Sequence, residues 1–210
     1  IARTDSTTMG LGLVYNGLDL EAGQEVVTTE HDHYATHASL ALRAARSGIG
    51  LRRVALYDDL ATVREEAIVD RLLREVGPRT RAVAVTWVHS GTGLKIPVSA
   101  IAEGLERVNR HRDAADRVLL CVDGVHGLGV EDVGVGDLGC DFFIAGTHKW
   151  LCGPRGTGLV WGHPRAHGRL APTIPTFSPR QGWGGLHTPG GFHSFELRWA
   201  LAEAFELHEA

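Results

Sequence analysis

Short apolar segments alternate with longer segments of helical periodicity along most of the chain. The apolar segments are mostly continuous runs, which are typical of strands covered by helices on both faces. The predicted strands are Glu25–Thr29, Arg53–Tyr57, Ala82–Val88, Val118–Val122, Asp141–Ala145 and Gly158–Trp161. The predicted helices are Thr8–Leu18, Tyr34–Ser47, Leu60–Val76, Val98–His111 and Phe195–Glu209. This alternation favours an α/β fold with a mostly parallel sheet sandwiched by helices, and an antiparallel α+β domain is the alternative.

Residues Gly162–Gly191 interrupt this alternation, because proline and glycine recur throughout the segment. Phe177 and Trp183 supply apolar anchors, so we interpret the segment as an ordered loop rather than a linker. Long ordered loops tend to be functional.

Composition narrows the class of protein. The chain has 210 residues, 43% of them hydrophobic and 22% charged, which is typical of a globular protein. A formal charge of −4 excludes a broadly basic nucleic-acid-binding surface. No apolar run reaches the roughly 18 residues that a membrane-spanning helix needs, so we predict neither a nucleic-acid nor a membrane partner.

Cysteine usage and the first residues bear on location. Three scattered cysteines make a disulfide scaffold a poor interpretation, and we predict a cytoplasmic protein. The first residues contain neither a signal peptide nor a lipidation site. Because the chain starts at Ile1, we expect residues 1–210 to be a fragment of a longer protein.

Polar clusters follow four of the predicted strands. They are Glu30–His33, His89–Gly93, Asp123–Gly127 and Gly146–Trp150. In an open parallel sheet, ligands bind beyond the carboxyl ends of the strands, so all four clusters are expected at one edge.

Lys149 is one of two lysines in the chain, the other being Lys95. It lies between the apolar residues Phe142–Ala145 and Trp150–Leu151, and dry surroundings lower the pKa of an amine. Such an amine is a nucleophile toward a carbonyl. A surface lysine that happens to follow a strand is the alternative.

Asp123 ends an apolar strand, where a carboxylate is costly unless a cation pairs with it. That cation is a protonated pyridinium or an arginine; a helix cap or a metal ligand is the alternative role. A carboxylate and an amine on neighbouring strand ends would bracket a flat ring. Pyridoxal phosphate needs this pair, with lysine on its aldehyde and aspartate on its ring nitrogen.

Smaller motifs allow two interpretations each. Ser6–Thr8 before a helix is either a plain cap or, with the amides of the helix start, a phosphate site. His31, His33 and His37 suggest zinc, although a ring stacked on an aromatic cofactor suits His31 better. Cys152 has no neighbouring base, and we interpret it as a buried structural thiol.

Taken together, these motifs resemble those of class V aminotransferase-like enzymes, which are fold type I pyridoxal-phosphate enzymes and include cysteine desulfurases and isopenicillin N epimerase-like proteins. The resemblance covers nearly the whole chain. It rests on Thr7-Thr8 with Gly10, Thr29-Glu30-His31, Ser90–Gly93, Asp123-Gly-Val-His126-Gly, Gly146-Thr147-His148-Lys149-Trp-Leu-Cys-Gly-Pro and His187-Thr188-Pro189. It implies that residues 1–210 are the large cofactor-binding domain and that the small domain is largely absent.

The resemblance also implies catalytic roles. Lys149 would form the internal aldimine and later move the α-proton. His31 would stack on the pyridine ring, and Asp123 would pair with the ring nitrogen. His126 and Ser90 would approach the ring hydroxyl.

Further roles concern the cofactor phosphate. The resemblance implies that Thr7, Thr8 and His148 bind it, together with Thr147. Thr188 would reach the phosphate of a neighbouring subunit, since active sites in the family lie at a homodimer interface.

The sequence departs from the family at several points. Met9 stands where an acidic residue is common, and Ser90 stands where desulfurases usually have asparagine. The small domain usually carries the arginine for the substrate carboxylate and, in desulfurases, the persulfide-forming cysteine. Neither is located in this chain.

The predicted function is a pyridoxal-phosphate enzyme that acts on an amino acid. We favour a C–S lyase that performs β-elimination on cysteine or a cysteine S-conjugate, and an aminotransferase or amino-acid epimerase is the alternative. A non-catalytic α/β binding protein and a histidine-based metallohydrolase are the alternatives of other classes.

Overall fold

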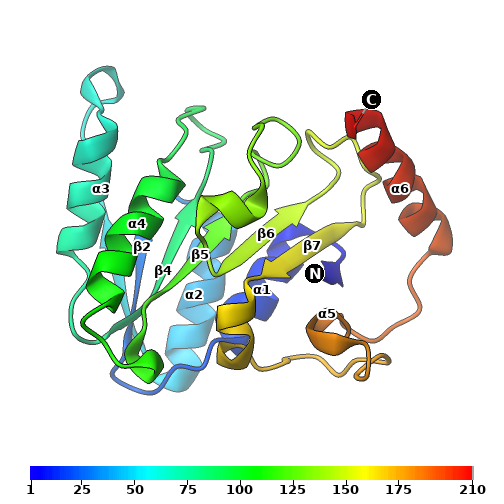
Figure 1. Cartoon of the computed structure of the whole chain (residues 1–210), viewed down its shortest axis with the longest axis horizontal. Coiled ribbons are helices and arrows are strands. Elements are labelled where there is room, and N and C mark those ends of the chain that lie inside the picture. The colour runs from blue at the N-terminus through cyan, green and yellow to red at the C-terminus, as the bar shows by residue number, and fades with distance from the viewer. Residues whose placement is uncertain (210) are drawn as a thin grey trace.

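A seven-stranded sheet forms the centre of the protein in this computed structural model, which describes residues 1–209 (Figure 1). The strands are β1 (Ala2–Thr4), β2 (Glu25–Thr29), β3 (Gly50–Val54), β4 (Thr80–Thr86), β5 (Leu119–Asp123), β6 (Phe142–Gly146) and β7 (Gly158–Gly162), in the spatial order β1-β7-β6-β5-β4-β2-β3. Strands β2 to β6 are parallel, and β7 and β1 are antiparallel to their neighbours. The predicted, mostly parallel α/β sheet is confirmed, and the antiparallel α+β alternative is wrong.

Helices cover both faces of this sheet. The helices of residues 1–209 are α1 (Thr7–Gly17), α2 (Tyr34–Ser47), α3 (Glu65–Arg74), α4 (Val98–Asn109), α5 (Gly182–His187) and α6 (Phe195–Glu209), and the first four cover the two faces. Helices α3 and α4 pack on one face and α1 and α2 on the other (Figure 1). None of the helices in residues 1–209 is both long and apolar enough to cross a membrane.

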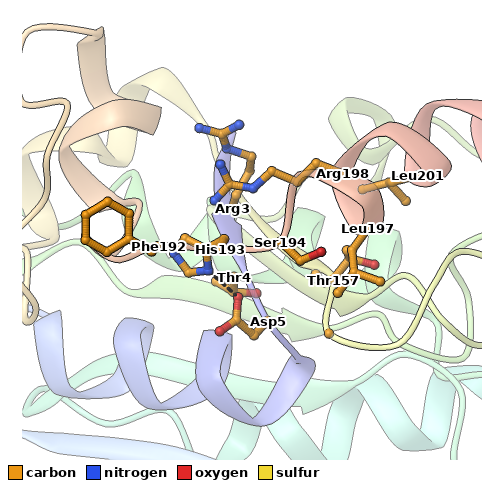
Figure 2. Close-up of a pocket in the computed structure, with 12 residues that line it drawn as sticks. Arg3, Thr4, Asp5, Thr157, Phe192, His193, Ser194, Leu197, Arg198 and Leu201 are labelled. Carbon is orange, nitrogen blue, oxygen red and sulfur yellow. Dashed lines mark ion pairs between the residues drawn. The ribbon is translucent and has the colours of Figure 1, made fainter.

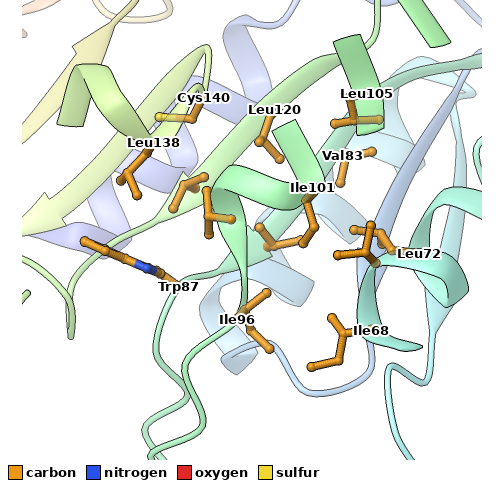
Figure 3. Packing of buried hydrophobic residues seen from close by; sticks show 14 of the residues in the cluster. Ile68, Leu72, Val83, Trp87, Ile96, Ile101, Leu105, Leu120, Leu138 and Cys140 are labelled. Carbon is orange, nitrogen blue, oxygen red and sulfur yellow. The ribbon is translucent and has the colours of Figure 1, made fainter. Parts of the chain in front are cut away.

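Alternate residues of the central strands supply the two cores. Val83 and Val85 of β4 belong to the core under α3 and α4, whereas Ala82 and Ala84 belong to the core under α1 and α2. Every residue of β4, β5 and β6 is buried, which explains why their sequences are continuous apolar runs. Figure 3 shows Ile101 of α4 packed among the residues of the first core.

The structure corrects several predicted boundaries. Strand β3 is Gly50–Val54 instead of Arg53–Tyr57, because its pairing with β2 joins Glu25 to Gly50 and Thr29 to Val54. Strand β1 was not predicted, since three residues carry no periodicity and the strand depends on pairing with β7. The segment predicted as one helix over Leu60–Val76 is a 3₁₀ turn, Leu60–Thr62, followed by α3.

The segment Gly162–Gly191 is more structured than the predicted loop. It contains a 3₁₀ helix, Pro164–Arg169, as well as α5. A proline in the first turn and a side-chain cap from His163 start the 3₁₀ helix.

Close packing of α1 places its first residues at the carboxyl edge of the sheet. A Cβ atom at Gly10 would lie 2.5 Å from Ile144 Cγ2, so only glycine lets α1 lie this close to β6. At the end of β6, the backbone N–H of Gly146 donates to Thr7 Oγ1 at 2.7 Å. The N-terminus of α1 therefore meets the carboxyl ends of the central strands.

Candidate active site

A cavity of about 190 Å³ lies at the carboxyl edge of the sheet, beside the N-terminus of α1. It brings together the predicted residues Thr7, Thr8, His31, Ser90, Asp123, His126, His148 and Lys149. Its other lining residues are Ser6, Leu11, His33, Ala35, Thr86, His89 and Val125. Two predicted site residues, Thr147 and Thr188, do not line the cavity.

Asp123 occupies the last position of β5 and is only 2% exposed. Within residues 1–209, its carboxylate accepts one hydrogen bond, from the backbone N–H of Val125 at 3.1 Å. Burial away from water raises the pKa of Asp123 to about 6, and Lys149 opposes this rise. A buried carboxylate with so few partners is well suited to receive a cation.

Lys149 follows β6, and its Nζ atom lies 2.8 Å from Nε2 of His126. Partial burial lowers the pKa of Lys149, and the charge of Asp123 opposes this change. The expected dry surroundings exist on one side only. Phe142–Ala145 are buried, but Lys149 is itself exposed and Trp150 is 53% exposed.

His31 is held in a defined plane by residues that follow β3. Its ring stacks on Tyr57 with 3.9 Å between centroids and 7° between planes. The backbone N–H of Leu56 donates to Nε2 of His31 at 3.2 Å, so the proton of the neutral ring is on Nδ1. Burial lowers the pKa of His31, which favours this neutral form. The motif search missed Tyr57, because no local signal connects it to His31.

The start of α1 forms one end of the cavity. Ser6 caps the helix by accepting from Met9 N at 3.1 Å. Thr7 and Thr8 occupy the first turn, where helix amides lack intrahelical partners. Gly146 lies beside this turn, and a Cβ atom there would lie 2.9 Å from Thr7 Oγ1 and 3.2 Å from His148 Nδ1. The threonine and histidine side chains therefore converge where glycine leaves space.

Thr147 and Thr188 bind other parts of the protein. Thr147 is fully buried, and its hydroxyl shares a hydrogen bond with the hydroxyl of Thr157. Thr188 accepts from Arg3 N at 3.0 Å and donates to Gly184 O at 2.7 Å. Neither hydroxyl lies at the cavity of its own chain, because neighbouring backbone and side-chain groups hold it elsewhere.

Two further lining residues had no predicted site role: Thr86, which ends β4, and His89, which belongs to the cluster His89–Gly93 expected at this edge. Thr86 Oγ1 and both ring nitrogens of His89 are buried and have no hydrogen-bond partner within residues 1–209. Buried polar atoms in folded proteins are normally paired, so these atoms point to a ligand in the cavity. The position of His89 after a predicted strand correctly placed it at this edge, whereas no sequence signal pointed to Thr86.

The histidines that suggested zinc have structural partners. His33 caps α2 by accepting from Ala35 N at 3.3 Å, and His37 donates from Nε2 to Thr29 O at 2.7 Å. No group of three or more metal-binding side chains occurs within residues 1–209.

Cys152 is exposed, so its interpretation as a buried thiol is wrong. It has a left-handed backbone with φ of 58° in the turn after Lys149, and this turn projects into solvent. Cys121 and Cys140 are buried, and all three thiols are free.

A larger cavity of about 280 Å³ lies between β1 and α6 (Figure 2). None of the predicted site residues lines it. At its wall, Asp5 Oδ1 lies 3.2 Å from Nδ1 of His193, as Figure 2 marks. This cavity is larger than the carboxyl-edge cavity, but neither a lysine nor a buried carboxylate of residues 1–209 lines it.

Comparison with known protein families decides the family. The model of the aminotransferase class-V family matches residues 1–177. The chain belongs to the class-V aminotransferase family. The family predicted from the motifs is therefore confirmed, and class-V aminotransferases are pyridoxal-phosphate enzymes.

Curated class-V relatives include two enzyme types. Isopenicillin N epimerase of Streptomyces clavuligerus is 29% identical over 192 residues, which cover 88% of this chain and 44% of the relative. A cysteine desulfurase of Klebsiella pneumoniae (strain 342) is 31% identical over 169 residues, covering 79% of this chain and 38% of the relative. The chain thus spans less than half the length of these relatives.

Solved structures agree with this fold. The cystine C–S lyase C-DES, in complex with its reaction product cysteine persulfide, superposes with a TM-score of 0.87 at 27% identity. This match covers 99% of this chain and 55% of that structure. A mutant of C-DES with glycine covalently linked to its pyridoxal-phosphate cofactor gives a TM-score of 0.86 at 26% identity, with the same coverage.

Proposed function

We propose that the carboxyl-edge cavity binds pyridoxal 5′-phosphate and that residues 1–210 are the large cofactor-binding domain of a longer enzyme acting on an amino acid. The observation that carries this proposal is the pair Asp123 and Lys149, a buried carboxylate and an amine on the walls of one cavity. In the sheet, Asp123 pairs with Ile144 of β6, five residues before Lys149.

The residues present fit this cofactor. Asp123 would accept the N–H of the pyridinium ring, which removes the cost of burying its charge. Thr7, Thr8 and His148 would hold the phosphate at the start of α1. Thr86 Oγ1 and the ring nitrogens of His89 have no hydrogen-bond partner within residues 1–209, and polar atoms of the cofactor would supply one.

Two further contacts orient the ring of the cofactor. His31, already flat against Tyr57, would stack its other face on the pyridine ring. Ser90 and His126 would approach the ring hydroxyl from the segments after β4 and β5. We predict no metal in the site.

When bound, the cofactor supplies an electron sink for the α-carbon of the substrate. Lys149 would hold the cofactor through its aldehyde and would serve as the general base and acid for the α-proton of the substrate. Asp123 would keep the ring nitrogen protonated, which increases the acidity that the cofactor gives to this α-proton.

We favour C–S bond cleavage by β-elimination on cysteine or a cysteine S-conjugate. The structural similarity to a cystine C–S lyase and the sequence similarity to cysteine desulfurases support this choice. The epimerase relative keeps amino-acid epimerisation open, and transamination is the other alternative. All three reactions use the same lining residues, so the difference depends on groups that hold the substrate.

We also propose that the enzyme is a cytoplasmic homodimer with shared active sites. This arrangement rests on the resemblance to class-V enzymes, which implies a role for Thr188 at the phosphate of a neighbouring subunit; within its own chain the Thr188 hydroxyl binds Arg3 N and Gly184 O. Sedimentation or light scattering of the wild type measures the assembly, and a strictly monomeric holoenzyme would contradict it.

Reconstitution with pyridoxal 5′-phosphate tests the cofactor assignment. We expect an absorbance band at the visible edge of the ultraviolet that borohydride removes. After this reduction, the cofactor should be covalently attached to the peptide that contains Lys149. Lys149→Ala should lack the band, whereas Lys95→Ala should keep it, because Lys95 pairs with Glu131 away from the cavity. A wild-type protein that never forms an imine would favour the non-catalytic binding protein.

A panel of amino acids and S-conjugates tests the reaction type. Pyruvate with ammonia would support β-elimination, an α-keto acid with consumption of an amino acceptor would support transamination, and racemised substrate would support epimerisation. Keto-acid formation or racemisation without pyruvate would overturn the lyase assignment.

A further inference from the structure

A chain of hydrogen bonds connects Trp150, His126 and Lys149 at the mouth of the cavity. The indole N–H of Trp150 donates to Nδ1 of His126 at 3.1 Å. On the other side of the same imidazole, Nε2 of His126 lies 2.8 Å from Nζ of Lys149. The two aromatic rings meet edge to face, with 61° between their planes.

The chemistry of indole determines where the proton of His126 is. An indole N–H only donates, so Nδ1 of His126 must provide the lone pair. Burial lowers the pKa of His126 below its ordinary 6.5, so the ring is neutral near pH 7. A neutral ring with a bare Nδ1 has its proton on Nε2. Nε2 therefore donates, and Lys149 Nζ has to accept.

Only an uncharged amine can accept a hydrogen bond, because an ammonium group has no lone pair. We propose that Trp150 is a positioning residue that fixes His126 as the Nε2–H tautomer, so that His126 donates to the uncharged amine of Lys149 and holds it in its nucleophilic form. The proposal deepens the proposed function, on which the meaning of a nucleophilic Lys149 rests.

Close backbone packing holds the two ring-bearing segments together. Gly129 has a φ of 83°, and a Cβ atom there would lie 2.7 Å from the backbone nitrogen of Leu151. The segment after β5, which carries His126, therefore lies directly against the turn that carries Lys149 and Trp150. His208 of α6 adds a hydrogen bond to the carbonyl oxygen of Trp150 at 3.0 Å.

The other charged groups near Lys149 act in both directions. Asp123, at the end of β5, favours the ammonium form. Burial is the main cause that lowers the pKa of His33, which caps the start of α2, and a charged Lys149 lowers it further. The remaining titratable groups of the same cavity are His31, His89 and His148. Asp123 therefore favours the ammonium form of Lys149, whereas the hydrogen bond donated by His126 favours the uncharged amine, because it needs the nitrogen lone pair.

The reactivity of Lys149 in the cofactor-free protein tests the hydrogen-bond chain of Trp150, His126 and Lys149 without a measurement of enzyme activity. Acetaldehyde with cyanoborohydride alkylates uncharged amines, and peptide mass spectrometry measures Lys149 and Lys95 separately across a pH series. In Trp150→Phe, we expect the pH at which Lys149 labelling is half-maximal to rise by about 0.5 to 1 unit. At pH values below this midpoint, labelling of Lys149 should be about 3- to 10-fold lower than in the wild type. Lys95 is the internal control and should not change, and neither should Lys149 in Trp199→Phe, since Trp199 is 72% exposed and outside the cavity.

A double-mutant cycle separates this role from a general loss of structure. His126→Gln replaces the ring by an amide whose N–H donates without help from Trp150, so adding Trp150→Phe should cause no further shift. Nitrogen chemical shifts of His126 in the wild type should show the Nε2–H tautomer, and Trp150→Phe should add the Nδ1–H form. An unchanged tautomer and midpoint in Trp150→Phe, or an equal shift in the His126→Gln background, would overturn the proposal. Failure of the cofactor assignment is read separately, from the absence of an imine with pyridoxal 5′-phosphate.

Discussion

Two buried aspartates at opposite ends of the central strands differ in how many protein groups pair with them. Asp141, just before β6, and Asp123, at the end of β5, are 1% and 2% exposed. Asp141 accepts from Leu120 N at 2.8 Å and forms an ion pair with Arg165 at 2.7 Å, whereas Asp123 accepts one hydrogen bond from Val125. Equal burial with unequal pairing distinguishes a carboxylate that holds the fold together from one that is left for a ligand.

Neutral groups repeat this contrast. At the amino ends of the strands, the Asn109 side chain accepts from Val118 N at 2.8 Å and donates to Val118 O at 3.0 Å. At the carboxyl ends, Thr86 Oγ1 and the His89 ring nitrogens have no partner within residues 1–209. Unpaired buried atoms distinguish the carboxyl-edge cavity from the larger cavity beside α6, whose lining has none within residues 1–209, although such atoms also occur elsewhere, for example Trp183 Nε1.

The largest effect is expected from Asp123→Asn, which keeps the shape of the side chain and removes its charge. Turnover of the reconstituted enzyme should fall on the order of 10²- to 10³-fold, since breaking a buried ion pair costs about 3–5 kcal/mol. Steady-state kinetics with saturating cofactor measure this change. Asp5→Asn, in the cavity beside α6, is the matched control and should keep turnover near that of the wild type; equal losses would remove the distinction between the cavities.

Asp141→Asn, just before β6 at the amino ends of the strands, should have the opposite effect: the stability of the fold falls and cofactor binding is kept. It removes the negative charge opposite Arg165 and one of the two carboxylate oxygens that accept from Arg165 and Leu120 N, so the free energy of unfolding should fall by about 2–3 kcal/mol. Chemical denaturation measures this loss, and cofactor affinity under native conditions should change little. A protein as stable as the wild type would mean that pairing at this end does not support the fold.

The pH dependence of the cofactor-free protein sharpens the comparison. The pKa of Asp123 is about 6 in the folded protein and ordinarily 3.8, so the folded state binds a proton that the unfolded chain releases. The free energy of unfolding should therefore fall as pH rises from about 4 to 6, by at most about 3 kcal/mol.

Thermal melts of wild type and Asp123→Asn across this pH window measure that contribution. The variant cannot ionise at this position, so it should lose this part of the slope and be more stable than the wild type above pH 6. Parallel slopes in the two proteins would show that the pKa of Asp123 is not raised in the folded state.

The smallest effect is expected from Thr86→Val, which removes a hydroxyl with no protein partner while keeping the shape of the side chain. The cofactor-free protein should be unchanged or up to about 1 kcal/mol more stable, because a buried polar group without a hydrogen bond is removed. Cofactor affinity, measured by titration of absorbance, should weaken. Destabilisation by several kcal/mol would instead show that the hydroxyl supports the fold.

Much of the architecture follows from local sequence alone. Strands β4, β5 and β6 are buried on both faces, so their apolar runs identify them without any partner. Because they are parallel, the residues that follow them meet at one edge, and the positions of Asp123 and Lys149 on that edge follow from their places in the chain.

The tertiary structure alone decided which polar groups are paired. Tyr57 stacks on His31, Trp150 donates to His126, and Arg3 binds Thr188 across 185 residues of sequence. The exposure of Cys152 likewise depends on the turn in which it lies. Burial is encoded in local hydrophobic pattern, whereas a hydrogen bond needs two groups at a set distance and angle, and only the folded chain brings such distant groups together.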